Sequence, residues 1–85
     1  MELRKIIGGN VKHYRFKRNM TQEALSELTN ISTNSISSIE NGKVDVRLST
    51  LESIAKALET DVVEFFGKQK RAASKWRVDL RDKKS

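Results

Sequence analysis

The sequence predicts an all-α domain, a compact bundle of five short helices, followed by a basic C-terminal tail. Its 85 residues include no proline and four glycines, so few residues oppose helix formation. Apolar residues recur at the spacing of a helix face through most of the chain. Residues typical of helix caps and turns separate these periodic stretches. Together these observations favour helices joined by short turns over a strand-rich sandwich.

A first helix is expected over about residues 3–18. Its apolar stripe falls at helical spacing and consists of Leu3, Ile6, Ile7, Val11 and Tyr14. The pair Gly8-Gly9 lowers the helix propensity of the first half. The regular helix could therefore begin later than Leu3.

The second helix is predicted to begin after Thr21, a candidate N-cap. Met20 before the cap and Leu25 after it stand in the positions of a hydrophobic staple. Leu25 and Leu28 form the expected buried stripe of this short helix. Asn30 is suited to a left-handed turn after it, because asparagine tolerates that conformation.

The third helix repeats this device immediately. Ser32 is its candidate N-cap, and Ile31 and Ile36 occupy the staple positions. Gly42, after Asn41, is expected to end the helix.

Two further helices complete the bundle. The fourth is expected to begin between Asp45 and Ser49, with an apolar stripe of Leu48, Leu51, Ile54, Ala55 and Leu58. Asp61 and Glu64 have the spacing of a capping box. This box would open a last short helix that carries Val62, Val63, Phe65 and Phe66.

The outer face of the third helix has an unusual composition. On a helical wheel, Ile36, Ile39, Ser32 and Glu40 share one side, and Asn34, Ser38 and Asn41 lie opposite, flanked by Thr33 and Ser37. A merely solvated face would more naturally carry Lys, Glu or Gln, which favour helices. Short donors and acceptors suit a backbone that approaches the edges of DNA bases, where Asn pairs with adenine and Ser or Thr with several edges.

The net charge of +6 is unevenly distributed. Residues 1–66 contain nine Lys or Arg and nine Asp or Glu, so the whole excess lies in residues 67–85. Within the body, residues 1–18 are basic and residues 52–64 acidic, so one end is expected to attract polyanions and the other to repel them. Solvated helix faces would account for the same counts. The tail fits a helical stripe (Ala72, Trp76 and Leu80), a strand alternation (Trp76, Val78 and Leu80) or disorder; partial order is favoured, because a lone tryptophan usually packs against a neighbour.

The stretches "MTQEALSELTNISTNSISSIENGK" and "LSTLESIAKALETDVVEFF" resemble the Cro/C1-type (XRE family) helix-turn-helix DNA-binding domains. The resemblance covers about residues 7–66 and implies a fold of the lambda-repressor type. It divides the chain into a helix-turn-helix domain, residues 1–66, with its core at about residues 21–41, and a basic C-terminal tail, residues 67–85. In this family such domains bind DNA as two-fold dimers.

The resemblance also implies roles for individual positions. The residues that match base-reading positions are Thr33, Asn34 and Ser38, with Ser37 at the margin. Those that match contacts to the DNA backbone are Thr21, Gln22, Asn41 and Lys43. Arg15 and Glu40 match a pair that forms an internal salt bridge, and the helical wheel independently turns Glu40 inward, where a carboxylate needs a partner.

Several of these positions have a simpler explanation. Gln22 could be a solvated first-turn residue, Asn41 a turn former, and Ser37 a solvent-facing side chain. Arg15 could contact phosphate rather than Glu40.

The chain also departs from the family pattern. Asn30 and Glu59 stand where the family often has glycine, and Val46 where it often has proline. Glu59 therefore suggests a different turn or local strain.

The predicted function is a sequence-specific transcriptional regulator, more plausibly a repressor or autoregulator, acting on an operator in double-stranded DNA. It would belong to the phage, plasmid, restriction–modification controller or antitoxin type. A homodimer is expected, with Phe65, Phe66, Trp76 and Leu80 as candidate interface residues, although one or both phenylalanines could be core. The alternative is a protein-interaction or non-specific nucleic-acid-binding module that acts through the basic tail.

Enzymatic activity is not expected. His13 is the lone histidine, no cysteine is present, and no nucleophile–base set can be identified. We therefore predict no cofactor, metal or small-molecule ligand. No apolar run approaches the roughly 18 residues of a membrane span, so no membrane span is expected. The absence of cysteine fits a reducing cytosol, and a cytoplasmic location is expected.

Overall fold

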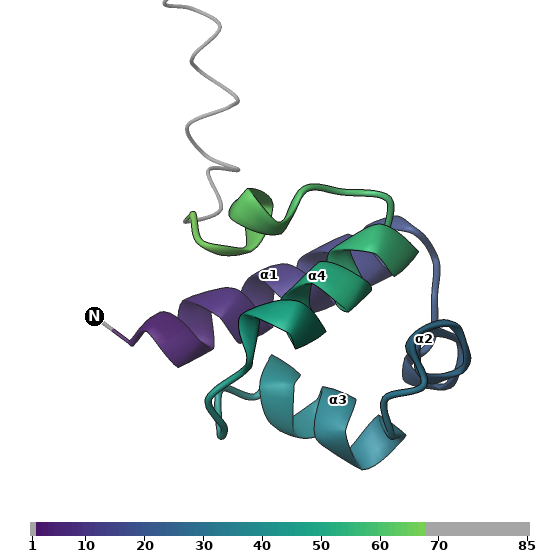
Figure 1. Cartoon of the computed structure of the whole chain (residues 1–85), viewed down its shortest axis with the longest axis horizontal. Coiled ribbons are helices and arrows are strands. Elements are labelled where there is room, and N and C mark those ends of the chain that lie inside the picture. Colours follow the sequence, from purple (N-terminus) through teal and green to yellow (C-terminus); the bar gives the residue numbers. More distant parts are fainter. Residues whose placement is uncertain (1, 68–85) are drawn as a thin grey trace, which may run out of the picture.

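The structure, a computed structural model, describes residues 2–67, which form four α-helices and one 3-10 turn without a strand. These elements are α1 (Leu3–Lys17), α2 (Gln22–Thr29), α3 (Thr33–Glu40), α4 (Leu48–Ala57) and η1 (Val62–Phe65). α3 packs against α1 and α2, α2 also contacts α4, and η1 contacts α1 and α4. In Figure 1, α3 lies below α1 and α4, η1 lies above them, and α2 closes one end. The predicted all-α class is confirmed.

The caps of α2 and α3 form as predicted. The hydroxyl of Thr21 accepts a hydrogen bond from the backbone N–H of Ala24 at 3.0 Å, and that of Ser32 accepts from the N–H of Ser35 at 3.1 Å. Each bond satisfies a donor that the first turn of a helix leaves unpaired. Between the two helices, Asn30 takes the left-handed conformation with a φ of 63°. The three-residue turn of residues 30–32 is thus set by local chemistry.

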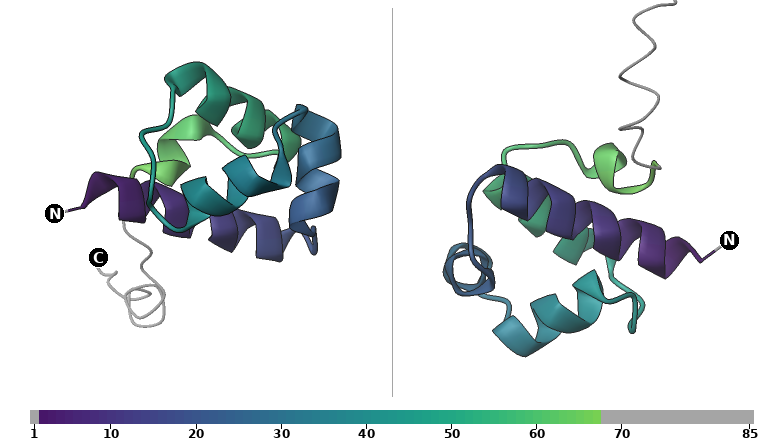
Figure 2. Two further views of the ribbon diagram at one scale, coloured as in Figure 1. Left: turned by 90° about the horizontal axis from the view of Figure 1, so that it is seen from below. Right: turned by 180° about the vertical axis from the view of Figure 1, so that it is seen from behind.

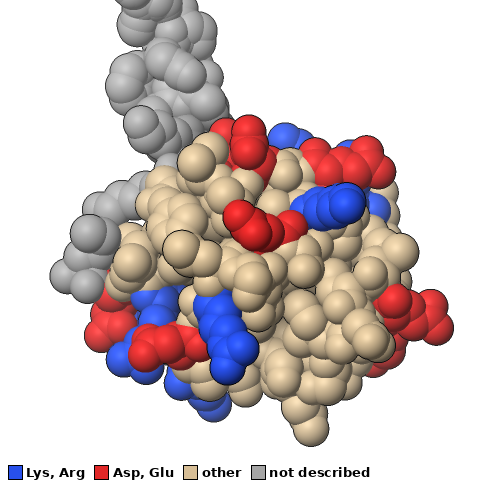
Figure 3. Space-filling view, viewed as in Figure 1, with Lys and Arg blue, Asp and Glu red and all other residues tan. Residues whose placement is uncertain are grey.

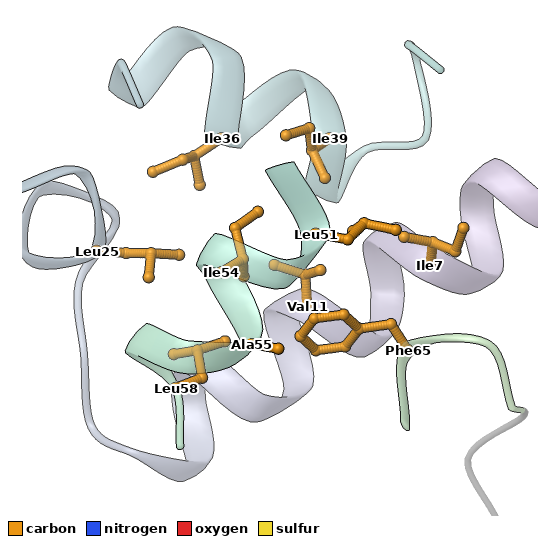
Figure 4. Packing of buried hydrophobic residues seen from close by; sticks show 10 residues of the cluster. All are labelled: Ile7, Val11, Leu25, Ile36, Ile39, Leu51, Ile54, Ala55, Leu58 and Phe65. Atoms are coloured by element: carbon orange, nitrogen blue, oxygen red, sulfur yellow. The ribbon is translucent and has the colours of Figure 1, made fainter. Parts of the chain in front are cut away.

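The core draws on every element. Its buried apolar residues are Ile7, Val11, Leu25, Ile36, Ile39, Leu51, Ile54, Ala55, Leu58 and Phe65. Figure 4 shows Ile36 and Ile39 of α3 pointing toward α4 and α1, while Leu25 reaches in from α2. The staple residues Met20 and Ile31 are partly buried against this cluster. α3 is therefore anchored along its whole inner side.

The expected fifth α-helix is instead the four-residue 3-10 turn η1. The predicted capping box does not form: Asp61 makes no cap bond, and Glu64 accepts a hydrogen bond from the Tyr14 hydroxyl at 3.0 Å. Burial and this contact with Glu64 raise the pKa of Tyr14. Buried Asn10 of α1 donates to the carbonyl of Phe65 at 2.8 Å. Contacts with α1, rather than a local cap, hold η1.

Two leucines of the predicted apolar stripes are exposed, and for Leu28 the prediction of a buried position is wrong. Leu28 of α2 retains 62% of its surface and Leu48 of α4 retains 66%. α2 is only eight residues long, and Leu25 is its one fully buried residue. Leu48 stands at the first position of α4, ahead of the buried turn that starts with Leu51. A leucine at helical spacing is buried only where another element covers it.

The structure settles two points that the sequence left open, the start of α1 and the turn at Glu59. α1 is continuous from Leu3 through Gly8-Gly9, so the helix does not begin late. Glu59 has a φ of 57°, in the left-handed region that glycine would adopt more easily. Its carboxylate pairs with Arg18 at 2.8 Å.

No helix of residues 2–67 is long and apolar enough to cross a membrane.

Candidate nucleic-acid interface

The outward face of α3 carries only short, uncharged side chains. Asn34 is exposed, and the others on this face are partly exposed: Thr33, Ser37 and Ser38. The one charged residue of α3, Glu40, is buried. Figure 3 shows this lower edge of the molecule as largely uncharged, with blue and red side chains gathered beside it. The structure therefore brings the four predicted base-reading positions onto one accessible surface.

The polar atoms of this face are largely unused within the protein. Among residues 2–67, the side chains of Thr33, Asn34 and Ser38 make no hydrogen bond or ion pair. Ser37 accepts a long hydrogen bond from the amide of Asn41, at 3.4 Å. Donors and acceptors of the first three are thus open to a ligand, and Ser37 is partly engaged by its neighbour.

A buried ion pair fixes the end of α3. The Arg15 Nε and Nη2 atoms donate to the two carboxylate oxygens of Glu40, at 2.7 and 3.0 Å. The two side chains keep only 7% and 2% of their surface. Arg15 also donates to the carbonyl of Met20 at 2.8 Å, and Gln22 donates to Glu40 at 3.1 Å. The pair joins α1, the start of α2 and the end of α3, and it leaves Arg15 no role at the surface.

The predicted backbone-contact residues lie at helix ends. Thr21 and Gln22 open α2, and Asn41 and Lys43 follow α3. Asn41 is the C-cap of α3, and Gly42 has a φ of 69°, so the expected stop is confirmed. Lys43 is exposed, and no acidic side chain of residues 2–67 pairs with it.

The basic end of the domain is partly neutralised. Of its basic residues, Arg4 pairs with Asp45 at 3.4 Å, Arg18 pairs with Glu59, and Arg15 is internal. In the described chain, Lys5, Lys12 and Lys17 have no acidic partner. The charge separation that residue counts predict is therefore weakened by ion pairs, because half of these cations face carboxylates.

A hollow of about 440 Å³, the α3 hollow, lies beside this face. Its lining includes Asn34, Ser35 and Ser38 of α3 and residues 44–47 of the α3–α4 loop. Arg47, the last loop residue, was not among the predicted site residues. The signal for it in the sequence is an arginine immediately before a helix, where a short polar cap is usual.

The four candidate residues of the dimer interface differ in their exposure and in whether the structure describes them. Phe65 is fully buried in the core, so its side chain is not available to a partner, whereas Phe66 keeps 38% of its surface. Trp76 and Leu80 lie outside the described residues. Phe66 joins Leu3 and Leu48, both exposed, around a second hollow of about 540 Å³, the α1–α4 hollow.

The described residues hold no metal-binding cluster. Within positions 2–67, no group of three His, Asp or Glu side chains could bind a metal ion. His13 packs edge-on against the ring of Tyr14, with ring centroids 4.9 Å apart.

The chain is similar to known helix-turn-helix proteins. The model of the HTH_3 helix-turn-helix family matches residues 11–65. The chain is 38% identical over 69 residues to the control protein C.SmaI of Serratia marcescens, covering 81% of this chain and 82% of that protein. It is 35% identical to the immunity repressor of Bacillus phage phi105, covering 74% of this chain but only 44% of the repressor.

A solved structure agrees with the fold. The restriction-modification controller protein C.AhdI from Aeromonas hydrophila matches with a TM-score of 0.71 and 24% identity, covering 74% of this chain and 96% of that one. In both views of Figure 2, α2 and α3 stand as two helices joined by a short turn, with α3 at the surface. The family match, the relatives and the geometry agree: the chain belongs to the HTH_3 family of helix-turn-helix, DNA-binding transcriptional regulators.

Proposed function

We propose that the chain is a sequence-specific regulator that binds a near-palindromic operator as a homodimer, with residues 33–38 in the major groove. The observation that carries this proposal is the outward face of α3. Its side chains are short and uncharged, and those of Thr33, Asn34 and Ser38 are unpaired among the described residues, yet the helix beneath them is fixed by the core and by the Arg15–Glu40 pair. A rigid helix with free donors and acceptors suits the reading of base edges.

Asn34 is the strongest candidate for direct base contact. Its amide N–H can donate to N7 of adenine while its amide oxygen accepts from the N6 amino group, which forms a bidentate pair. Thr33 and Ser38 can serve donor or acceptor edges, and Ser37 contributes less because Asn41 engages its hydroxyl. With no long side chain on this face, ordered water and DNA deformability would supply part of the specificity.

Contacts to the DNA backbone would position α3. Gln22 uses one amide hydrogen on Glu40, so its second hydrogen is free for a phosphate. The Thr21 hydroxyl accepts the cap bond and can still donate. Asn41 and Lys43 follow α3 and would approach the next phosphates, which fix register without reading sequence.

The α1–α4 hollow supports the homodimer. Leu3, Leu48 and Phe66 expose apolar surface there, and exposed apolar surface of this kind marks interaction sites. Asp45 and Val46 line both this hollow and the α3 hollow. A two-fold contact at this surface would therefore lie next to the reading face and could set two α3 helices about 34 Å apart, one helical turn of DNA.

Among the regulator types, a short controller protein is favoured. The match to C.SmaI extends over most of both chains, whereas the phage repressor is more than twice as long as the matched segment. Autoregulation of a restriction–modification operon would follow, and a neighbouring nuclease or methyltransferase gene would support it.

The decisive experiment is to incubate the full chain with fragmented DNA of its source at near-physiological salt and sequence what is retained. We expect one near-palindromic motif with half-sites 10–10.5 base pairs apart, centre to centre. Retention without a motif would contradict base reading by residues 33–38. It would favour the alternative, non-specific binding through residues 67–85, whose eight Lys or Arg outnumber two Asp.

A further inference from the structure

Arg47 lines the α3 hollow together with residues from the outward face of α3. Asn34 and Ser38 line the same hollow. These two residues carry their polar atoms close to the backbone. Arg47 carries five donors at the end of a long stem, so it can reach a base edge that α3 cannot.

The backbone of Arg47 is fixed while its side chain is free. Its carbonyl accepts from the N–H of Leu51 at 3.0 Å, and the preceding Val46 packs against the core. The side chain is exposed and pairs with no acidic group of residues 2–67. The nearest acid in sequence, Asp45, is held by Arg4 at 3.4 Å. An arginine that reads DNA needs a fixed backbone and a guanidinium group that is not paired within the protein, and Arg47 has both.

Arg47 is also a poor choice for its local position. It is the N-cap of α4, with φ −67° and ψ 146°, and its side chain makes no cap bond. Ser, Thr, Asp and Asn are preferred at such a position, and a cation there opposes the helix dipole. A residue that weakens its own helix at the edge of a reading face is better explained by a ligand than by stability.

We infer that Arg47 is a specificity-determining residue of the DNA complex: its guanidinium binds O6 and N7 of a guanine flanking the bases that face α3. This inference rests on the proposed function, since it requires α3 in the major groove. Arginine is the side chain best matched to the two acceptors of guanine. The outward face of α3 has no long side chain that could contact bases. Arg47, at the start of α4, would supply one.

The test uses the full chain and a randomised operator library, sequenced after selection. The variants are Arg47→Ala, Arg47→Lys and Arg47→Ser, with Lys56→Ala as the control at the other end of α4, where the same charge is removed. We expect Arg47→Ala and Arg47→Ser to lose roughly 5- to 150-fold discrimination for guanine at one position of each half-site. The position read by Asn34 should keep its preference, and Lys56→Ala should keep every preference.

Arg47→Ser guards against a folding artefact. Serine is a preferred N-cap, so this variant should melt at or above the temperature of the wild type. Arg47→Lys retains the charge but lacks the planar fork, so it should recover little of the guanine preference.

Three results would overturn the inference. In the first, Arg47→Ala binds all DNA sequences more weakly by the same factor, its slope of log affinity against log salt is lower by about 0.9, and Arg47→Lys recovers full affinity. Arg47 would then be a phosphate contact. Unchanged preferences in Arg47→Ala would make it a solvated residue. A wild-type protein that selects no motif would overturn the proposed function and this inference together. If the wild-type protein selects a motif and either of the first two results is found, only the inference about Arg47 fails.

Discussion

At the residue scale, the polar side chains of α3 divide by direction. Glu40 turns inward and is buried against Arg15, whereas Asn34 and Ser38 turn outward and are unpaired in the described protein. The first arrangement stabilises the position of the helix, and the second leaves it able to bind. Two predictions separate these roles.

Replacing Asn34 by Ala should change base preference without unfolding the domain. If its amide pairs with adenine, the variant loses about 1–3 kcal/mol of discrimination at one base position of each half-site. The measurement is selection from a randomised operator library, with a thermal melt as the control for folding. An unchanged base preference would remove Asn34 from the reading face.

Replacing Arg15 by Ala should destabilise the domain strongly. It leaves the Glu40 carboxylate buried without its partner, which typically costs about 3–5 kcal/mol. The matched control is Arg18→Ala, which breaks an exposed pair with Glu59 and should cost no more than about 1 kcal/mol. Urea denaturation of both variants measures the difference, and equal losses would contradict the internal role of Arg15.

At the element scale, α1 sets the position of α3. The two helices pack so closely at Gly8 that a Cβ atom there would lie 2.2 Å from the carbonyl oxygen of Ile39 and 2.8 Å from that of Glu40. Gly9, the next residue, has open space around its Cα. One glycine of the pair is therefore required by helix packing, and the other is not.

These neighbours provide a matched test. Gly8→Ala should destabilise the domain by about 1–3 kcal/mol, because the added methyl group forces α3 to move. It should also weaken operator binding. Gly9→Ala should stabilise the domain by about 0.5–1 kcal/mol, because alanine favours the helix and meets no neighbour. Chemical denaturation measures the free energy of unfolding of both variants. Stabilisation by both substitutions would contradict the tight contact, because it would show that α1 and α3 can move apart without loss of stability.

At the scale of the whole molecule, exposed apolar residues mark different surfaces. Leu48 lines the α1–α4 hollow with Phe66 and Leu3, whereas Leu28 lies on α2 beside a smaller hollow with Lys56 and Ala57. Leu48 and Leu28 are almost equally exposed, at 66% and 62%. They therefore form a matched pair for locating the dimer interface.

Leu48→Ser should weaken the dimer, and Leu28→Ser should not. Burial of a leucine contributes about 1.5–3 kcal/mol, and a two-fold interface would lose this contribution twice. Sedimentation over a range of protein concentrations measures the dissociation constant of the dimer, and operator titration should show a parallel loss of affinity. Dimers of wild-type affinity in Leu48→Ser, or a wild type that stays monomeric, would contradict the proposed interface.

The sequence by itself determined the all-α class, the starts of α2 and α3, the left-handed turn at Asn30 and the stop at Gly42. Caps, staples and turns join residues that are close in the chain, so their chemistry can be read from spacing. It also determined that Glu40 turns inward, because helical periodicity assigns each residue a face.

Only the tertiary structure decided which apolar residues are covered. Leu25 and Phe65 are buried, while Leu28, Leu48 and Phe66 stay exposed, although all of them match an apolar pattern. The 3-10 form of η1, the tight contact at Gly8 and the place of Arg47 beside α3 are further examples. Each depends on which elements meet in space, and periodicity along a single helix carries no information about its neighbours.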